Sequence, residues 1–153
     1  MAKINLSGYI DSSIVDGPGV RFAVYTQGCI HKCLGCHNPK TWCTKPNQII
    51  EIDDLIELIN AESLGSNVTI SGGDPLLQFA STYELCVKLK RQGYNIWLYT
   101  GYTLAEIEQS KQLSPILKTI DVLVDGKFEK ELRDYKLEYR GSSNQNIIDC
   151  NKL

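Results

Sequence analysis

Apolar residues along this chain recur with two periods, which predict an alternation of strands and helices. Short runs rich in β-branched and aromatic residues indicate strands, and apolar residues three and four apart indicate helices. Glycines such as Gly65 and Gly93 follow two of the predicted helices as stop signals. The predicted strands cover residues 20–26, 68–71, 95–100 and 120–124, and the predicted helices cover 52–64, 75–91, 104–109 and a turn at 128–133.

This order of elements is typical of an α/β fold with a parallel sheet and helical crossovers. A complete eight-unit β/α barrel needs about 200 residues or more, so a chain of 153 residues can form only part of one. We therefore predict a partial, incomplete β/α barrel with a mostly parallel sheet, built as a single domain over residues 1–153. Such sheets bind ligands at the carboxyl ends of their strands, and an incomplete barrel also leaves an open side.

Composition and charge restrict the class of protein. Hydrophobic residues make up 42% of the chain and charged residues 22%, which is ordinary for a globular domain. The net charge of −2 argues against a nucleic-acid binder, which would carry a basic face. No apolar run reaches the length of a membrane span, and the first residues lack the apolar core of a signal peptide. We therefore expect a cytoplasmic protein that binds neither nucleic acid nor membrane.

Three of the six cysteines lie within eight residues, directly after the first predicted strand. The spacing of Cys29, Cys33 and Cys36 is Cys-x3-Cys-x2-Cys, which is dense enough for a soft metal or an iron–sulfur cluster. A saturated 4Fe–4S cluster takes four thiolates, so three would leave one iron open to a substrate. On spacing alone, a zinc site or a closed four-thiolate cluster remains an alternative. The candidate fourth ligands for these alternatives are His31, His37 and Cys43.

A second motif, Gly72-Gly73-Asp74-Pro75, follows the predicted strand 68–71. Asp74 is a good N-cap and Pro75 a good first residue of a helix, so a plain strand–helix turn explains half of the motif. Two consecutive glycines are not needed for a cap, and they allow a positive φ or close approach of the backbone to a ligand. The position of the motif, one strand after the cysteines, favours the binding interpretation.

The cysteine spacing resembles the signature of the radical S-adenosylmethionine (SAM) superfamily. The glycine motif is similar to the Gly-Gly-Glu motif of those enzymes, with Asp74 in place of glutamate. Gly35 is a further departure, since the residue before the last cysteine is often aromatic in the superfamily. Four more segments, at 16–21, 97–102, 121–128 and 140–145, narrow the match. Together they resemble the activating proteins of anaerobic (class III) ribonucleoside-triphosphate reductases, over most of the chain.

This resemblance implies an enzyme that generates a radical on another protein. A one-electron donor such as flavodoxin or ferredoxin would reduce the 4Fe–4S cluster, and the cluster would split SAM into methionine and a 5′-deoxyadenosyl radical. That radical would remove a hydrogen atom from a glycine of the anaerobic ribonucleoside-triphosphate reductase and leave a glycyl radical. The alternatives are an activase of another glycyl-radical enzyme and, in a different class, an iron–sulfur electron carrier or zinc-binding module without SAM chemistry.

The resemblance also assigns roles to individual residues. It implies no acid or base catalyst, because abstraction of a hydrogen atom by a cofactor radical needs none. The residues that it assigns are Cys29, Cys33 and Cys36 as cluster ligands with one iron left open, Gly35, Cys36 and His37 beside the adenine of SAM, Gly72, Gly73 and Asp74 at its methionyl end, and Thr100 at its ribose or methionyl part.

Other residues have weaker assignments. Asp125 and Lys127 follow the last predicted strand, and we expect them at the same rim of the sheet. Residues 140–145 would dock the reductase or complete the SAM pocket. Cys86 lies on the apolar face of a predicted helix and is expected in the core. Cys150 is expected as an exposed thiol in a polar tail.

Overall fold

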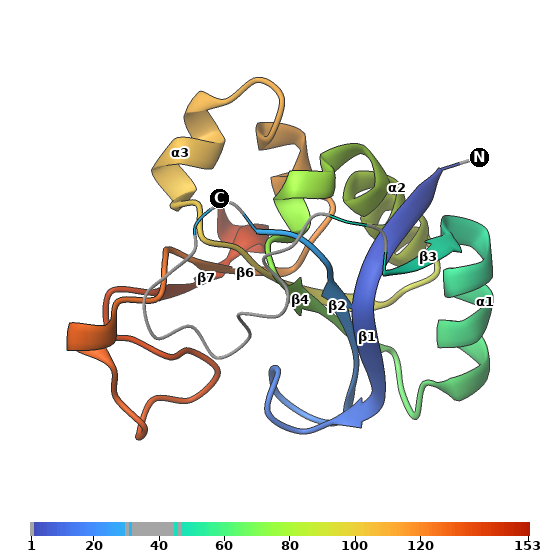
Figure 1. Ribbon diagram of the computed structural model, residues 1–153, viewed down its shortest axis with the longest axis horizontal. Coiled ribbons are helices and arrows are strands. Elements are labelled where there is room, and N and C mark those ends of the chain that lie inside the picture. Colours follow the sequence, from blue (N-terminus) through green and yellow to red (C-terminus); the bar gives the residue numbers. More distant parts are fainter. Residues whose placement is uncertain (1, 30, 32–44, 46) are drawn as a thin grey trace.

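The computed structural model of the protein describes residues 2–29, 31, 45 and 47–153. In this part of the chain a seven-stranded sheet forms the centre of the molecule, in the order β3-β1-β2-β4-β5-β6-β7 (Figure 1). The strands are β1 (Lys3–Ser13), β2 (Arg21–Thr26), β3 (Gln48–Glu51), β4 (Asn67–Gly72), β5 (Asn95–Tyr99), β6 (Val122–Asp125) and β7 (Asn146–Asp149). The α-helices are α1 (Ile52–Glu62), α2 (Phe79–Arg91) and α3 (Leu104–Gln109), and 3₁₀ turns lie at Pro75–Gln78, Ser114–Lys118, Lys130–Leu132 and Cys150–Lys152.

The centre of the sheet is parallel and its two sides are antiparallel. Strands β2, β4, β5 and β6 run parallel to one another. Strand β1 is antiparallel to both β2 and β3, and β7 is antiparallel to β6. The prediction of an α/β fold with a parallel sheet is confirmed for these four central strands, whereas β1, β3 and β7 were not predicted. None of the helices in the described ranges is long and apolar enough to span a membrane.

The two faces of the parallel strands differ because successive side chains of a strand point to opposite sides. One face packs against the helices and forms the hydrophobic core, in which the strand side chains are almost fully buried. Strand residues of this face include Phe22, Val24, Val68, Ile70, Ile96 and Leu98, and helix residues include Leu55, Ile59, Leu85, Leu89 and Ile107. The alternate strand residues, on the opposite face, are Arg21, Tyr25, Thr69, Ser71, Trp97 and Tyr99.

The segment predicted as one helix from 75 to 91 is divided into a 3₁₀ turn and α2. Gln78 lies at the junction with a non-helical backbone, at φ −107° and ψ 53°. Its side chain accepts a hydrogen bond from the amide of Asn5 (2.8 Å) and donates to the carbonyls of Asn5 (2.8 Å) and Gln27 (3.0 Å). Gln78 therefore joins the start of α2 to the main chain of β1 and to the segment that follows β2.

The C-terminal segment is a strand and not the polar tail expected from the sequence. The main chain of β7 pairs with β6, and the amide of Cys150 donates to the carbonyl of Asp121 at 2.8 Å. Cys150 is only 8% exposed and belongs to the core, so the prediction of an exposed thiol is wrong. The prediction for Cys86, which is fully buried, is confirmed. Burial raises the pKa of the Cys150 thiol to about 11 and that of Cys86 to about 12.

Candidate functional site

A cavity of about 1250 Å³ lies on the sheet face opposite the helices. Its floor is a row of side chains from neighbouring parallel strands. Tyr25 of β2 is in register with Ser71 of β4, and Tyr99 of β5 is in register with Val124 of β6. Because these residues belong to the same alternating set, the strand pattern itself builds the floor.

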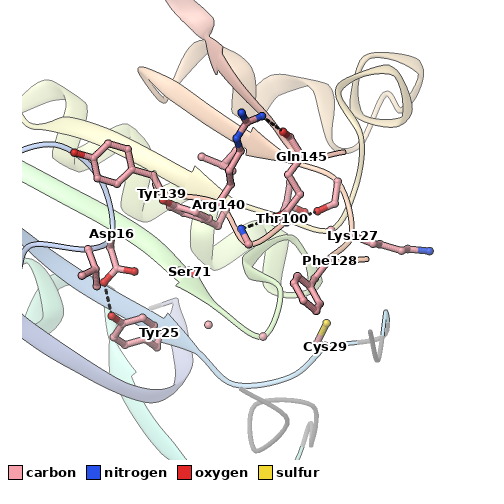
Figure 2. Close-up of a pocket in the computed structure, with 18 of the residues that line it drawn as sticks. Asp16, Tyr25, Cys29, Ser71, Thr100, Lys127, Phe128, Tyr139, Arg140 and Gln145 are labelled. Atoms are coloured by element: carbon pink, nitrogen blue, oxygen red, sulfur yellow. Dashed lines mark hydrogen bonds between the residues drawn. The ribbon is translucent and has the colours of Figure 1, made fainter. Parts of the chain in front are cut away.

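The cavity has two chemically different ends (Figure 2). Cys29 and Phe128 lie at one end in this view, and Asp16, Tyr25 and Tyr139 lie at the other. The walls come from segments far apart in the chain, namely the connection between β1 and β2 and the long segment between β6 and β7. From these two segments the lining residues include Ile14, Val15, Lys127, Tyr135, Leu137, Glu138, Arg140, Gly141 and Gln145.

Cys29 follows β2 and lines the cavity with 9% of its surface exposed. The chain turns at Gly28, which has φ +107° and whose carbonyl accepts a hydrogen bond from the amide of Asp74 at 2.8 Å. This turn places Cys29 beyond the carboxyl end of a parallel strand, where ligand sites are expected. The described residues contain no group of three metal-binding side chains. Cys33, Cys36, Cys43, Gly35 and His37 lie outside the described residues.

The glycine motif has a packing role in addition to its place at the cavity. Gly72 has φ +110°, and a Cβ there would overlap the main chain of Thr26 at the end of β2. The next amide, of Gly73, donates to the carbonyl of Thr26 at 2.9 Å. Both glycines line the cavity. Gly72 therefore permits a close approach of β4 to β2. The sequence had suggested a close approach of the backbone to a ligand at this position.

Asp74 is 1% exposed, and its carboxylate accepts hydrogen bonds from four residues. The amide of Leu76 donates to Oδ1 at 3.0 Å, which confirms Asp74 as the N-cap of the 3₁₀ turn. The hydroxyl of Thr100 lies 2.9 Å from both carboxylate oxygens, and the amide of Gly101 donates to Oδ2 at 2.9 Å. The fourth partner is His31, whose Nε2 lies 2.5 Å from Oδ2. Thr100 lines the cavity, so the structure brings it to the predicted edge.

His31 is a site residue whose position the sequence did not predict. Its side chain is 6% exposed and packs edge-on against Tyr102, with ring centroids 4.9 Å apart. The ring also lies against Gly101, where a Cβ would overlap it. The only signal in the sequence was its place between Cys29 and Cys33, which had suggested a metal ligand. Because a carboxylate oxygen can only accept, Nε2 of His31 carries the hydrogen in its bond to Asp74.

The far end of the cavity is built around Asp16. The hydroxyls of Tyr25 and Ser13 both donate to its Oδ2 at 2.5 Å. Burial, and then the neighbouring Asp16, raise the pKa of Tyr25, so this phenol stays protonated. Tyr99 lies on the same floor, and its hydroxyl has no hydrogen-bond partner among the described residues. Burial raises the pKa of Tyr99 as well.

Arg21 lies on the same face of the sheet as this floor, at the start of β2, and is 1% exposed. Its guanidinium donates to the hydroxyl of Thr69 at 2.8 Å, to the carbonyl of Val68 at 3.0 Å and to the side chain of Asn95 at 2.8 Å. It also lies 5.6 Å from the ring centroid of Trp97. Burial lowers the pKa of Arg21. The segment 16–21 therefore holds the amino ends of three parallel strands together.

The remaining sequence-predicted residues divide into two groups. The carboxylate of Asp125, which is 4% exposed, accepts hydrogen bonds from the amides of Leu104 (2.7 Å) and Asn146 (3.1 Å), so it connects α3 and β7 to β6. Lys127 lines the cavity, and so do Arg140, Gly141 and Gln145 of the segment 140–145. Within that segment, Arg140 donates to the carbonyl of Gln145 at 2.6 Å, which closes a turn in the cavity wall.

Known proteins are similar to this chain over most of its length. A family model described as a 4Fe-4S single cluster domain matches residues 15–148. Three similar relatives are each named anaerobic ribonucleoside-triphosphate reductase-activating protein. The protein of Vibrio cholerae is 38% identical over 94% of this chain and 97% of its own length. That of Enterobacteria phage T4 is 38% identical over 87% and 86%, and that of Escherichia coli K12 is 35% identical over 93% and 96%.

Proposed function

This chain belongs to the family of anaerobic ribonucleoside-triphosphate reductase-activating proteins, and we propose that it is a radical SAM enzyme that generates a glycyl radical on that reductase. The main support from the structure is the position of Cys29, which lies at the carboxyl end of β2 and lines a large cavity on the open face of the sheet. The match to a 4Fe-4S single cluster domain spans almost the whole chain, from residue 15 to 148.

The proposed ligands of the cluster are Cys29, Cys33 and Cys36, with one iron left for SAM. Cys29 fits this role because it is a thiol at the cavity surface, next to the main chain of a turn and not inside the core. Thiolates are the usual ligands of iron–sulfur clusters. Bound there, the reduced cluster would supply one electron for cleavage of SAM to methionine and a carbon radical, and the chemistry available would be removal of a hydrogen atom from a glycine Cα of the reductase, with 5′-deoxyadenosine as the other product.

The protein itself provides binding and orientation. We propose that Gly72, Gly73 and Asp74 hold the methionyl end of SAM through their main chain. We propose also that Thr100 lies next to this end of SAM. The carboxylate of Asp74 has four protein donors around it, so its contribution is to keep this edge of the site in place. For the adenine, the proposed neighbours remain Gly35, Cys36 and His37.

We propose that the sheet is a partial radical SAM barrel within a single domain, and that a loop of the reductase enters from its open side. Small-molecule sites usually measure about 300–1,000 Å³, so a cavity of about 1250 Å³ has room for a peptide segment beside a cofactor. Apolar side chains stand exposed at its mouth, with Ile14 and Val15 each 71% exposed and Tyr135 82%. Holding the glycine Cα near the radical carbon requires no acid or base, only position.

The first test is the yield of 5′-deoxyadenosine from anaerobically reconstituted protein with SAM and dithionite, with and without the reductase of the same organism. We expect SAM cleavage that rises with reductase and a doublet EPR signal of the glycyl radical. Cys29→Ala should abolish both, because the cluster loses one of three ligands. Cys86→Ala is the matched control, since this thiol lies in the core away from the cavity. It should retain both signals.

Other results would point to the alternatives. Cleavage that does not respond to reductase would keep the radical SAM chemistry and assign another protein as substrate. A fully loaded 4Fe–4S cluster without any SAM cleavage would favour an electron carrier. A colourless protein that binds zinc would favour a zinc module. A flavodoxin or ferredoxin is the proposed electron donor, which fits a cytoplasmic protein.

A further inference from the structure

The function proposed above assigns no separate role to His31, whose buried side chain contacts Asp74. We propose that His31 is a positioning residue, which fastens the cysteine-bearing segment to the carboxyl ends of β4 and β5 through Asp74. This inference rests on the proposed cluster function, because it concerns the segment that carries Cys29 and the other two ligands. It does not depend on SAM cleavage or on the reductase.

The contact is short and shielded from water. Nε2 of His31 lies 2.5 Å from Oδ2 of Asp74, and their side chains are 6% and 1% exposed. In such surroundings a hydrogen bond is electrostatically stronger than in water, and loss of one partner leaves the other buried and unsatisfied. His31 lies only two positions after Cys29 in the sequence. An anchor at His31 therefore restricts the backbone next to a proposed ligand.

The Asp74 carboxylate has three other hydrogen-bond donors besides His31. The amides of Leu76 and Gly101 and the hydroxyl of Thr100 all donate to the Asp74 carboxylate, which sets its orientation. Gly101 also leaves room for the imidazole ring, and Tyr102 packs against the edge of that ring. The histidine thus enters a site formed by the ends of two neighbouring strands. Outer groups that orient the ligands of a metal site typically change its affinity for the metal by about 10- to 100-fold.

The same geometry argues against two other roles, contact of the Asp74 carboxylate with SAM and ligation of iron by Nε2 of His31. The carboxylate of Asp74 is not part of the cavity lining, whereas Gly72, Gly73 and Thr100 are. The carboxylate is therefore placed to hold the protein and not to contact SAM. The Nε2 atom of His31 is occupied by Asp74, so it is not a ligand atom for iron.

The test measures loss of iron from the reconstituted protein to a chelator, under anaerobic conditions and without SAM or reductase. The variants are His31→Ala, Asp74→Asn and the double variant. Asparagine retains the N-cap of the 3₁₀ turn, so the Asp74 variant is expected to fold. We expect each single change to speed iron loss about tenfold, the lower end of the usual effect of outer partners. The double variant should lose iron no faster than the single variants, because both changes remove the same contact.

Two further variants distinguish loss of the His31–Asp74 contact from a general loss of stability. His31→Gln keeps a donor that can reach the carboxylate and should restore much of the slow iron loss. Tyr94→Phe is the control, because it removes a 2.7 Å hydrogen bond between two residues outside the cavity, Tyr94 and Asn60. It should leave the rate of iron loss unchanged.

Three results would overturn the proposal. The first is an unchanged rate in His31→Ala, and the second is fully additive effects in the double variant. The third is a nitrogen hyperfine coupling in the EPR spectrum of the wild-type cluster that His31→Ala removes, since this would make His31 a ligand. Failure of SAM cleavage in a protein that shows the expected iron-loss pattern would reject the proposed function and leave this inference standing.

Discussion

Gly72 is the residue at which backbone conformation and strand packing both exclude a side chain. Its φ of +110° is unfavourable for any residue with a Cβ, and that Cβ would overlap the main chain of Thr26. Gly93, after α2, also has a positive φ of +87°, but no atom lies within 4 Å of a Cβ placed there. The two glycines therefore separate the cost of the backbone conformation from the cost of the overlap.

We predict that Gly72→Ala lowers the free energy of unfolding by about 3 kcal/mol or more, because backbone atoms cannot move aside as a flexible side chain can. Gly93→Ala should cost only about 1 kcal/mol, the usual penalty of a left-handed conformation. Urea unfolding followed by circular dichroism measures both. Equal losses in the two variants would contradict the overlap with Thr26.

At the scale of elements, β7 and the following turn are integral to the sheet. Cys150 reports on this directly, since its thiol lies in the core and its amide bonds to the carbonyl of Asp121. A thiol reacts with alkylating reagents as the exposed thiolate. We predict that iodoacetamide at pH 8 labels Cys150 only as fast as the protein unfolds, and mass spectrometry of the labelled peptide measures this rate. Rapid labelling of the native protein would instead show a frayed terminus.

The raised pKa of Cys150 also predicts a pH dependence of stability. The native pKa of about 11 lies above the value of 9 for an unburied thiol, so the unfolded chain releases its proton first. The stabilisation from this thiol is complete below pH 9 and is lost as the pH rises through 11. The difference in free energy of unfolding between wild type and Cys150→Ala should therefore shrink over this window. A constant difference would mean that the thiol is exposed to water.

The elements that the sequence predicted are those whose pattern extends over a whole segment. Helix α1 has four buried apolar residues on helical spacing, and β2, β4, β5 and β6 are short runs of apolar residues between turn signals. The antiparallel strands were missed for physical reasons. The alternation in β1 breaks at a register shift between Leu6 and Gly8, and β3 and β7 each have only two isoleucines between polar residues. Their strand character comes from pairing with a neighbour, which a local pattern does not contain.

The same limit applies to the site. The position of Cys29 at a strand end followed from the order of elements, and the capping role of Asp74 followed from its neighbours in sequence. The bond between His31 and Asp74 joins residues 43 positions apart, and the four donors to Asp74 come from three separate segments. Only the folded chain brings these groups together, so no spacing rule could have indicated them.

For the whole molecule, the open mouth of the cavity predicts how the partner is recognised. Ile14 and Val15 are each 71% exposed at this mouth, so replacing them should not affect the core. We predict that the double variant Ile14→Ser, Val15→Ser raises the KM for reductase about tenfold or more, because apolar surface buried at an interface contributes much of its affinity. The free energy of unfolding should stay within about 0.5 kcal/mol of the wild-type value.

The control for this prediction is Leu64→Ser, which changes an equally exposed apolar residue, 75% exposed, away from the cavity. Glycyl-radical yield as a function of reductase concentration measures the KM of each variant. A KM that rises equally in the control, or that stays at the wild-type value in the double variant, would mean that the reductase approaches another surface.

The cavity takes one wall from the connection before β2 and another from the segment between β6 and β7, and this separation has a consequence for biosynthesis. Ribosomes add about 5–20 residues per second, so on the order of ten seconds pass between the synthesis of Cys29 and that of Gln145. During this interval Cys29 exists on a nascent chain without the cavity that it lines in the folded protein. If Cys29 holds the cluster as proposed, we expect cluster assembly to follow completion of the chain, and until then this thiol depends on the reducing state of its surroundings.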